Sequence, residues 1–257
     1  MHSIVEPRER LSGARASEDQ AAGESRAERK MIKDPPPLVS AAIVERPSAE
    51  EVARFRSAPT SFVVDALGGA GALDWRIKPV ADGVLLGVAL TCDCGPNDNL
   101  ALAAAVAQSE SGDVIVAATG GFTGAAVVGD LLLGIARNRG VVGFVTDGMV
   151  RDLVDLEALG MPVYAMGVTP NSPGRREPGT VGLPIVCGGR SIASGDVIVA
   201  DRDGVVSVPR ALIGETLANL ERVKAAEAAM LERVRGGLKD PPFVEAAQEG
   251  RAGKARD

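Results

Sequence analysis

Two adjacent charged residues, Arg151 and Asp152, end the segment TDGMVRD (146–152), which follows an apolar run and a glycine-containing turn. An arginine can bind a carboxylate through two parallel hydrogen bonds. An aspartate is a hard oxygen ligand that suits Mg²⁺ or Mn²⁺. The pair could instead be an ordinary helix start, because acidic residues are favoured in a first helical turn. In that case Arg151 and Asp155 would form a simple surface pair at the helical i, i+4 spacing.

A second strand-to-helix junction lies at Gly129 and Asp130, in the sequence GDLL (129–132). Gly129 would let the backbone approach a ligand closely. The start of the following helix presents unpaired N–H groups and a partial positive charge to an anion. In open α/β sheets, ligands bind outside the carboxyl ends of the strands, where both junctions are expected to lie. Together they describe a site for a small carboxylate on a divalent cation.

The single histidine and the three cysteines restrict the chemistry that the chain can perform. His2 lies in the polar N-terminal stretch, so a Ser-His-Asp triad, a Cys-His pair and a histidine-ligated zinc are excluded from the folded part. Cys92 and Cys94 form a single CxC, which is weak evidence for a soft-metal site. We interpret them and Cys187 as reduced thiols of a cytoplasmic protein. Lys224 could be proposed as a Schiff-base lysine, but its charged helix favours an exposed surface lysine.

The overall composition argues against nucleic acid and membranes as partners. The net charge is −6 and aromatic residues make up only 3% of the chain, so there is no basic excess for phosphates and there are few rings for stacking bases. The sequence contains no apolar run long enough to span a bilayer and no secretory signal. We therefore predict a cytoplasmic protein whose core is built from Val, Leu, Ile and Ala.

Alternating strand-like and helix-like segments predict the elements that position the two junctions. A polar extension at residues 1–35, expected to be disordered, precedes one α/β domain at 36–237, and a flexible tail covers 238–257. Strands are expected at 84–91, 113–118, 141–146, 163–166, 181–186, 197–200 and 205–208. Helices are expected from Ser48 as N-cap and at 61–67, 100–108 (capped by Asn97 or Asp98), 131–139, 151–159 and, as a long closing helix, 210–234.

The order and spacing of several motifs resemble those of a known family. The chain is similar, over about residues 37–237, to the 4-hydroxy-4-methyl-2-oxoglutarate aldolase family, which includes the regulator of ribonuclease E activity and proteins labelled demethylmenaquinone methyltransferase. The motifs that carry the resemblance are DNLALAAAV (98–106), SGDVIVA (111–117), GDLL (129–132), RGVVGFVTDGMVRD (139–152) and SGDVIVADRDGVVSVP (194–209).

The resemblance implies a fold, an assembly and a site. The fold would be an α/β/β/α sandwich like the swivelling phosphohistidine domain, assembled as trimers or hexamers with active sites between subunits. Arg151 would contact the substrate, Asp152 would bind Mg²⁺ or Mn²⁺, and Asp130, where the family usually has Glu, would hold a metal-bound water. A glutamate of the neighbouring subunit's closing helix, best matched by Glu227, would complete the site. The implied substrate-binding residues are Gly129, Asp130, Leu131, Leu132, Arg151 and Asn99.

The activity implied is the metal-dependent retro-aldol cleavage of a 4-hydroxy-2-oxo acid to pyruvate, with oxaloacetate decarboxylation as a side activity. A non-catalytic protein resembling the ribonuclease E regulator is the alternative. The presence of Asp152 and of the long closing helix favours the enzyme. A methyltransferase is disfavoured, because no glycine-rich adenosylmethionine loop follows an early strand. Selectivity for the substrate's side chain is expected to depend on the loop at 167–178, which carries Arg175 and Arg176.

Overall fold

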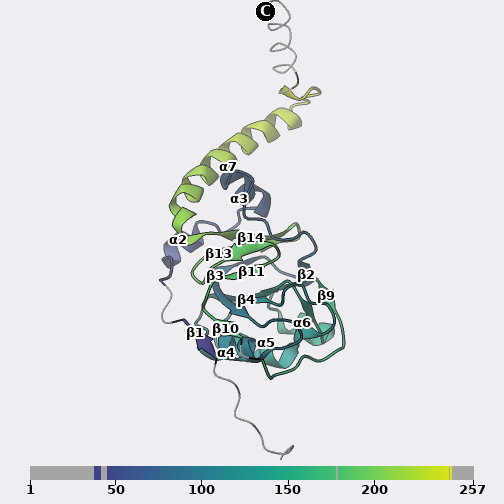
Figure 1. The fold of residues 1–257 in the computed structure, drawn as a ribbon. Helices are drawn as coiled ribbons and strands as arrows, with labels where there is room; N and C mark the ends of the chain where they lie inside the picture. Colours follow the sequence, from purple (N-terminus) through teal and green to yellow (C-terminus); the bar gives the residue numbers. More distant parts are fainter. Residues whose placement is uncertain (1–37, 42–44, 178, 243, 245–257) are drawn as a thin grey trace, which may run out of the picture. The chain divides into compact units, whose positions relative to one another are not determined.

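Four strands parallel to one another form the centre of the main sheet, in the order β3 (Leu85–Asp93), β4 (Asp113–Ala118), β6 (Gly143–Thr146) and β8 (Val163–Ala165) (Figure 1). Every residue of β4 and β6 is buried, as expected of strands covered on both faces. The computed structural model describes residues 38–41, 45–177, 179–242 and 244. The predicted extension, His2 and most of the predicted tail lie outside the described residues.

Helices connect the parallel strands, because parallel neighbours cannot be joined by a tight turn. In chain order, α4 (Leu100–Gln108) lies between β3 and β4, α5 (Asp130–Asn138) between β4 and β6, and α6 (Leu153–Leu159) between β6 and β8. These helices bury their apolar residues in one core against the sheet, through Leu102, Ala105, Leu133, Ala136 and Leu156. Each helix therefore begins near the edge of the sheet where the carboxyl ends of the strands lie.

Antiparallel strands extend the main sheet. At one edge β2 (Lys78–Ala81) pairs with β8. Beyond β3 lie β10 (Thr180–Val181), β1 (Val39–Ser40) and the hairpin of β13 (Val197–Asp201) and β14 (Gly204–Val208). β11 (Ile185–Cys187) and β12 (Arg190–Ile192) form a hairpin. This hairpin packs on the face of the main sheet opposite to the helices α4, α5 and α6. A small parallel sheet contains β5 (Ala126–Val128), β7 (Met149–Val150) and β9 (Gly167–Val168).

A second group of helices covers the β13–β14 hairpin. α3 (Thr60–Ala66) and α7 (Ile213–Arg235) share an apolar core with that hairpin, formed by residues such as Val63, Val199, Val206, Leu217 and Leu220. The short α2 (Ala49–Ala53) begins with a capping box between Ser48 and Glu51, and η1 (Arg210–Leu212) precedes α7. Figure 1 shows α4, α5 and α6 on one side of the strands and α3 and α7 on the other. The predicted α/β fold is confirmed.

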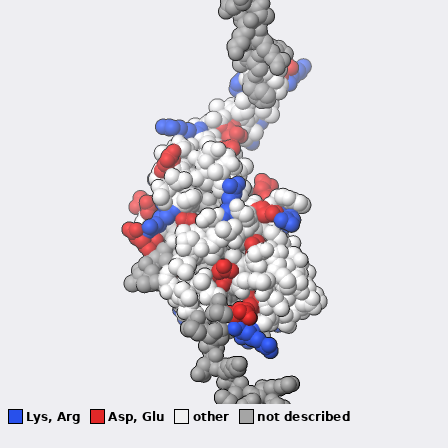
Figure 2. All heavy atoms as spheres, in the orientation of Figure 1, with Lys and Arg blue, Asp and Glu red and all other residues white. Residues whose placement is uncertain are grey.

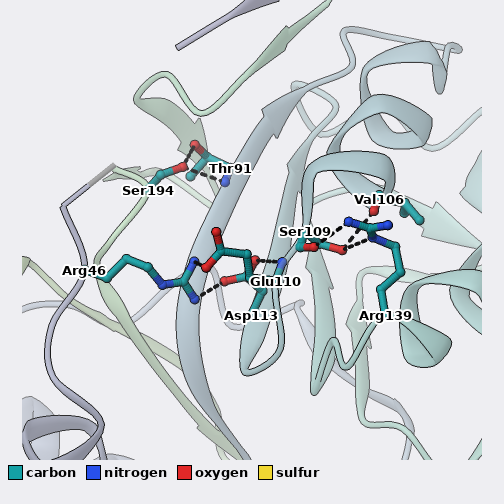
Figure 3. Close-up of polar contacts among 8 residues, drawn as sticks. All are labelled: Arg46, Thr91, Val106, Ser109, Glu110, Asp113, Arg139 and Ser194. Carbon is teal, nitrogen blue, oxygen red and sulfur yellow. Dashed lines mark hydrogen bonds and ion pairs between the residues drawn. The ribbon is translucent and has the colours of Figure 1, made fainter. Parts of the chain in front are cut away.

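Polar side chains anchor the amino end of β4, at the far end of the strand from the two junctions (Figure 3). The buried Asp113 accepts a hydrogen bond from Arg46 and another, at 2.7 Å, from the main-chain N–H of Glu110. Arg139 donates to the carbonyl of Ser109 at 2.9 Å. These bonds hold the turn between α4 and β4 from two sides, so the strand that leads toward GDLL starts from a fixed position.

Two predicted elements differ from the structure, and the closing helix is confirmed apart from its first turn. The helix expected at 151–159 begins only at Leu153, so Arg151 and Asp152 precede its first turn. The strand expected at 181–186 is two strands, β10 and β11, in different sheets. The closing helix expected at 210–234 is a 3₁₀ turn followed by α7, which ends at Arg235.

Candidate active site

A pocket of about 410 Å³ opens at the carboxyl-end edge of the parallel strands and contains both junctions. Their meeting depends on β5 and β7, which pair in parallel and lead directly into them. The main-chain N–H of Arg151 donates to the carbonyl of Val128 at 3.1 Å. The lining residues are Asn99, Val128, Gly129, Asp130, Leu131, Leu132, Arg151, Asp152, Ser172, Pro173, Gly174, Arg175 and Arg176. All predicted site residues except Glu227 are therefore brought together within one chain.

Position 129 requires glycine because it has no room for a side chain, and not because of its backbone conformation. Its φ of −132° is extended and open to any residue. A Cβ built on Gly129 would lie 2.2 Å from Oδ2 of Asp152 and 3.1 Å from Nε of Arg151. A side chain at 129 would therefore displace both charged groups.

Asp152 occupies the N-cap position of α6 but does not cap the helix. Its φ of 60° and ψ of 46° place it in the left-handed region, which is uncommon for a non-glycine residue although aspartate tolerates it better than most. No side-chain hydrogen bond joins its carboxylate to the α6 N–H groups. Such conformations are often held in place at functional sites. The carboxylate instead faces the pocket, which argues against the ordinary helix start.

Arg151 is positioned by its side-chain contacts on the pocket wall. Its Nε donates to Oδ2 of Asp152 at 3.1 Å, and its Nη1 donates to Oγ of Ser172. Among the ion pairs of the described residues, none joins Arg151 to Asp155. Ser172 was not predicted as a site residue, because only the folding of the 169–177 loop over β7 brings it to the pocket.

The first turn of α5 faces the same pocket with its main-chain N–H groups. Gly129 is the N-cap, and it makes no side-chain capping bond. Leu133 is the first residue whose N–H bonds back, to the carbonyl of Gly129 at 3.3 Å. Within the described part of the chain, the N–H groups of Asp130, Leu131 and Leu132 have no such partner, as is usual for a helix start. They are free to donate to a bound anion.

Asp98, one of the two predicted caps of α4, and its neighbour Asn99 connect the start of α4 to the pocket. Asn99 is the N-cap but makes no capping bond; its Nδ2 donates to the carbonyl of Val127 at 3.1 Å. Asp98 accepts from the N–H of Leu100 at 2.9 Å. Asn99 thereby fixes its amide on the pocket wall, next to β5.

Comparison with known proteins identifies the family of the chain. A sequence model of the family described as RraA-like, Aldolase/RraA, matches residues 60–207, more than half of the chain. The chain belongs to the RraA-like family. A relative from Halalkalibacterium halodurans, described as "Putative 4-hydroxy-4-methyl-2-oxoglutarate aldolase", is 36% identical over 179 residues, which are 69% of this chain and 85% of the relative.

Solved structures with similar folds agree with this architecture. RraAS2 of Streptomyces coelicolor, described as an unusual member of the RNase ES inhibitor RraA protein family, aligns with a TM-score of 0.64 and 26% identity over 74% of this chain and all of that one. The RNA-processing inhibitor RraA from Thermus thermophilis aligns with a TM-score of 0.56 and 25% identity, over 60% of this chain and 93% of that one. An uncharacterised protein from Pseudomonas syringae reaches a TM-score of 0.67 at 26% identity, covering 76% and 97% of the two chains.

The donor set of the RraA-like pocket fits a hard cation that keeps most of its water ligands. Two carboxylates, Asp130 and Asp152, line the pocket, and Mg²⁺ is commonly held by one or two carboxylates together with waters and substrate oxygens. The described residues contain no group of three or more His, Cys, Asp or Glu that could enclose a metal. A metal cage built from protein ligands alone, as in structural zinc sites, does not fit this set.

The cysteines pack in the core of the RraA-like domain. All three are free and buried, with the sulfurs of Cys92 and Cys94 4.0 Å apart. The contact with Cys94, together with burial, raises the pKa of the Cys92 thiol well above its usual value, and burial raises that of Cys187. The three cysteines therefore lie in the interior and not on the wall of the pocket.

Two residues of α7 have surface positions. Lys224 pairs with Glu221 at 3.1 Å and is absent from the pocket lining, as expected of a surface lysine. Glu227 is exposed and also lies off its own chain's pocket. Its predicted role toward a neighbouring subunit stays a prediction.

The surface drawn in Figure 2 shows basic and acidic side chains interspersed among the described residues, so neither sign dominates this face.

No described helix combines the length and the apolar character needed to cross a bilayer.

Proposed function

We propose that this RraA-like protein is a divalent-metal-dependent lyase that cleaves a 4-hydroxy-2-oxo acid, of the 4-hydroxy-4-methyl-2-oxoglutarate type, to pyruvate. The observation that carries the proposal is the convergence of the α5 amino end, Arg151 and Asp152 on one pocket at the carboxyl ends of the strands. These groups offer N–H donors for a carboxylate, a guanidinium for a developing negative charge, and a carboxylate for a hard cation. The description of the Halalkalibacterium relative as an aldolase supports the same reaction class.

The polar groups at the two junctions would have distinct roles in this reaction. The N–H groups of Asp130, Leu131 and Leu132 would bind the substrate's C1 carboxylate, which the partial positive charge of the helix start favours. Arg151 would donate to the C2 oxygen, where negative charge accumulates as the C3–C4 bond breaks. Asp130 would hold the water that takes the proton from the 4-hydroxyl oxygen. The C4 fragment then leaves as a carbonyl compound, and protonation at C3 gives pyruvate.

Mg²⁺ or Mn²⁺ would be held by Asp152, and when bound it would act as a Lewis acid on the 2-oxo group. The same residues suit the decarboxylation of oxaloacetate. There the bond that breaks joins C3 to the leaving CO₂, and Arg151 again faces the C2 oxygen that becomes negative. We therefore propose oxaloacetate decarboxylation as a side activity.

Purified protein is expected to release pyruvate from 4-hydroxy-4-methyl-2-oxoglutarate or from oxaloacetate in the presence of Mg²⁺. Removing divalent ions with EDTA should lower the rate at least about 100-fold, because Lewis-acid stabilisation of the developing charge is worth several kcal/mol. Adding Mg²⁺ or Mn²⁺ back should restore it. A coupled lactate dehydrogenase assay measures the release. If a panel of 4-hydroxy-2-oxo acids and oxaloacetate yields no pyruvate above the uncatalysed rate, the lyase proposal is wrong.

We further propose that the protein assembles as a trimer or hexamer in which Glu227 reaches a neighbour's pocket. The second half of α7 supports this: after Leu220 no described residue of the helix is buried, and Met230, Leu231 and Val234 expose apolar surface. Such a helix has an unused face for another subunit.

Mixed oligomers provide a test of the shared site. Glu227→Gln and Asp152→Asn should each inactivate a homogeneous oligomer. Mixed after dissociation and reassembly, the two variants should regain about one quarter of wild-type activity, because that fraction of randomly formed interfaces joins two intact halves. Pyruvate release after mixing measures the recovery, and light scattering confirms the assembly. No recovery in oligomers shown to be mixed would place Glu227 outside the neighbour's site.

The second candidate function is non-catalytic regulation. It is favoured by the structural likeness to two proteins described as RNA-processing or RNase inhibitors. A regulator needs a binding surface but no chemistry, so mutation of Asp152 would not change its effect. Inhibition of a ribonuclease E-type enzyme by wild-type and Asp152→Asn protein alike, without pyruvate release by either, would support this function.

A further inference from the structure

We propose that Asp147 and Thr119 are positioning residues of the candidate active site. Their buried hydrogen bonds hold the chain segments that carry the pocket residues in one arrangement. Neither side chain lines the pocket, so both act on it through other residues. This role rests on the proposed function, because the kinetic part of its test follows pyruvate release.

Asp147 and Thr119 occupy equivalent places on neighbouring strands. Thr119 is the first residue after β4, and Asp147 is the first residue after β6. Both are buried, with exposed fractions of 4% and 5%. Oδ1 of Asp147 accepts from the main-chain N–H of Thr119 at 2.7 Å and from its Oγ1 at 3.1 Å. The pair therefore joins the two segments that leave the carboxyl ends of the central strands.

The small parallel sheet begins close to this pair, and each of its strands leads to a different wall of the pocket. β5 leads into Gly129 and the first turn of α5. β7 begins two residues after Asp147 and leads into Arg151 and Asp152. β9 leads into the loop at 169–177. Whatever fixes the starts of these strands also fixes the groups at their ends.

Gly148 connects the pair to β7 and β9. A Cβ built on Gly148 would lie 2.7 Å from Oγ1 of Thr119, so the chain after Asp147 packs directly on the threonine. The carbonyl of Gly148 accepts from the main-chain N–H of Met166 at 3.0 Å, and Met166 directly precedes β9. The Asp147–Thr119 pair therefore fixes the start of β7 and, through Gly148, the start of β9.

The hydroxyl of Thr119 also holds the loop between β4 and β5. Its Oγ1 accepts from the main-chain N–H of Phe122 at 3.2 Å. A Cβ built on Gly124 would lie 2.5 Å from Cζ of Phe122, so the ring packs on this glycine. The hydroxyl donates to Asp147 and accepts from Phe122, so both of its hydrogen-bonding functions are used. A buried network satisfied in this way is rigid.

This loop reaches the pocket through Asn171. Nδ2 of Asn171 donates to the carbonyl of Gly124 at 2.9 Å, and the carbonyl of Asn171 accepts from the N–H of Ala126 in β5, also at 2.9 Å. The next residue is Ser172, which accepts from the guanidinium of Arg151. In the proposed function Arg151 faces the C2 oxygen, which becomes negative only as the C3–C4 bond breaks. Misplacement of Arg151 should therefore lower kcat more than it raises KM.

Thr119→Val removes the hydroxyl and keeps the shape of the side chain and the main-chain bond to Asp147. In the presence of Mg²⁺ it is expected to lower kcat for pyruvate release about 10-fold, with KM within about threefold of the wild-type value. Thr119→Ser keeps the hydroxyl and should retain kcat within about twofold.

Thr91→Val is the matched control for the loss of a buried hydroxyl. Oγ1 of Thr91 donates to the carbonyl of Leu183 at 2.7 Å and lies 2.7 Å from Oγ of Ser194 (Figure 3). Thr91 is fully buried in β3 and does not line the pocket. The substitution should lower the unfolding temperature as Thr119→Val does, and keep kcat within about twofold.

Hydrogen exchange measures the anchoring without turnover. Peptides spanning 166–177 should exchange at least about threefold faster in Thr119→Val protein than in the wild type, because the loss of a buried hydrogen bond favours local opening. The same peptides should exchange at the wild-type rate in Thr91→Val protein. Mass spectrometry of the full-length protein follows the exchange.

A double-mutant cycle tests Asp147 together with Thr119. Asp147→Ala should lower kcat at least about 30-fold, and Thr119→Val should lower it by less than about threefold further in that background. The Thr119 variants and the exchange measurement test the proposal even where Asp147→Ala protein does not fold.

Equal effects of Thr119→Val and Thr91→Val on kcat and on exchange at 166–177 would reduce the pair to a general structural role and overturn the proposal. Unchanged kcat and exchange in Thr119→Val protein would also overturn it, while an active wild-type protein leaves the lyase proposal standing. A wild-type protein that releases no pyruvate, with exchange at 166–177 faster only in Thr119→Val, would contradict the lyase proposal and support the anchoring.

Discussion

Asp152→Asn is expected to lower kcat/KM for pyruvate release by at least about 10³-fold, because it removes the negatively charged oxygen that holds the cation and with it several kcal/mol of charge stabilisation. Asparagine has nearly the same shape as aspartate. It also tolerates the left-handed backbone that residue 152 adopts, and its side-chain oxygen can still accept from Nε of Arg151. The loss of activity should therefore come from the removal of the negative charge at residue 152. The thermal unfolding temperature should stay close to that of the wild-type protein.

Asp155→Asn is the matched control, since Asp155 is an exposed first-turn carboxylate of the same helix that does not line the pocket. It should retain activity within about threefold, as expected for a surface substitution. Calorimetry should show weakened Mg²⁺ binding for Asp152→Asn and not for Asp155→Asn. Activity within about tenfold of wild type in well-folded Asp152→Asn protein would exclude Asp152 as the essential metal ligand.

Gly129→Ala is expected to lower kcat/KM at least about 100-fold, through the addition of one methyl group. The new Cβ would lie 2.2 Å from Oδ2 of Asp152, closer than any non-bonded contact allows, so the carboxylate and the Arg151 side chain must move. A displacement of about 1 Å in a catalytic group can cost about two orders of magnitude in rate.

The control for Gly129→Ala is Gly134→Ala, in the same helix. A Cβ at 134 would meet nothing closer than 3.8 Å, at Cδ2 of Leu159, and alanine is favoured over glycine in a helix interior by about 1 kcal/mol. Gly134→Ala should therefore retain activity and unfold at a higher temperature. A crystal structure of Gly129→Ala with Arg151 and Asp152 unmoved, or wild-type activity, would show that residue 129 is not restricted by contact.

Local composition predicted several long elements of the RraA-like domain well. The helix at 100–108 and the strand at 113–118 have the predicted boundaries, because an Ala-rich helix and a Val-rich buried strand each carry a clear local signal. The strands β5, β7 and β9 were not predicted. They are two or three residues long, too short for any alternation, and they exist because they pair with one another.

Some features of the candidate site could be predicted from the local sequence, and others could not. GDLL and the Arg151–Asp152 pair stand out as residue types, and the family resemblance added Asn99. The local sequence does not indicate that Ser172 touches Arg151 or that Asn99 accepts a hydrogen bond from Arg175, because these contacts join residues 21 and 76 positions apart. Only the folding of the 169–177 loop across β7 and the start of α4 creates them.

The residue types and order of this chain alone determined its fold class and the residues that could hold a carboxylate and a hard cation. They left TDGMVRD compatible with both a charged first helical turn and a binding site, because the same residue types favour both. The tertiary structure places Arg151 and Asp152 before the first turn of α6 and on the wall of the pocket. Pairing of β5 with β7 brings Gly129 against Asp152, and the left-handed backbone of Asp152 turns its carboxylate away from the helix it precedes and toward the pocket.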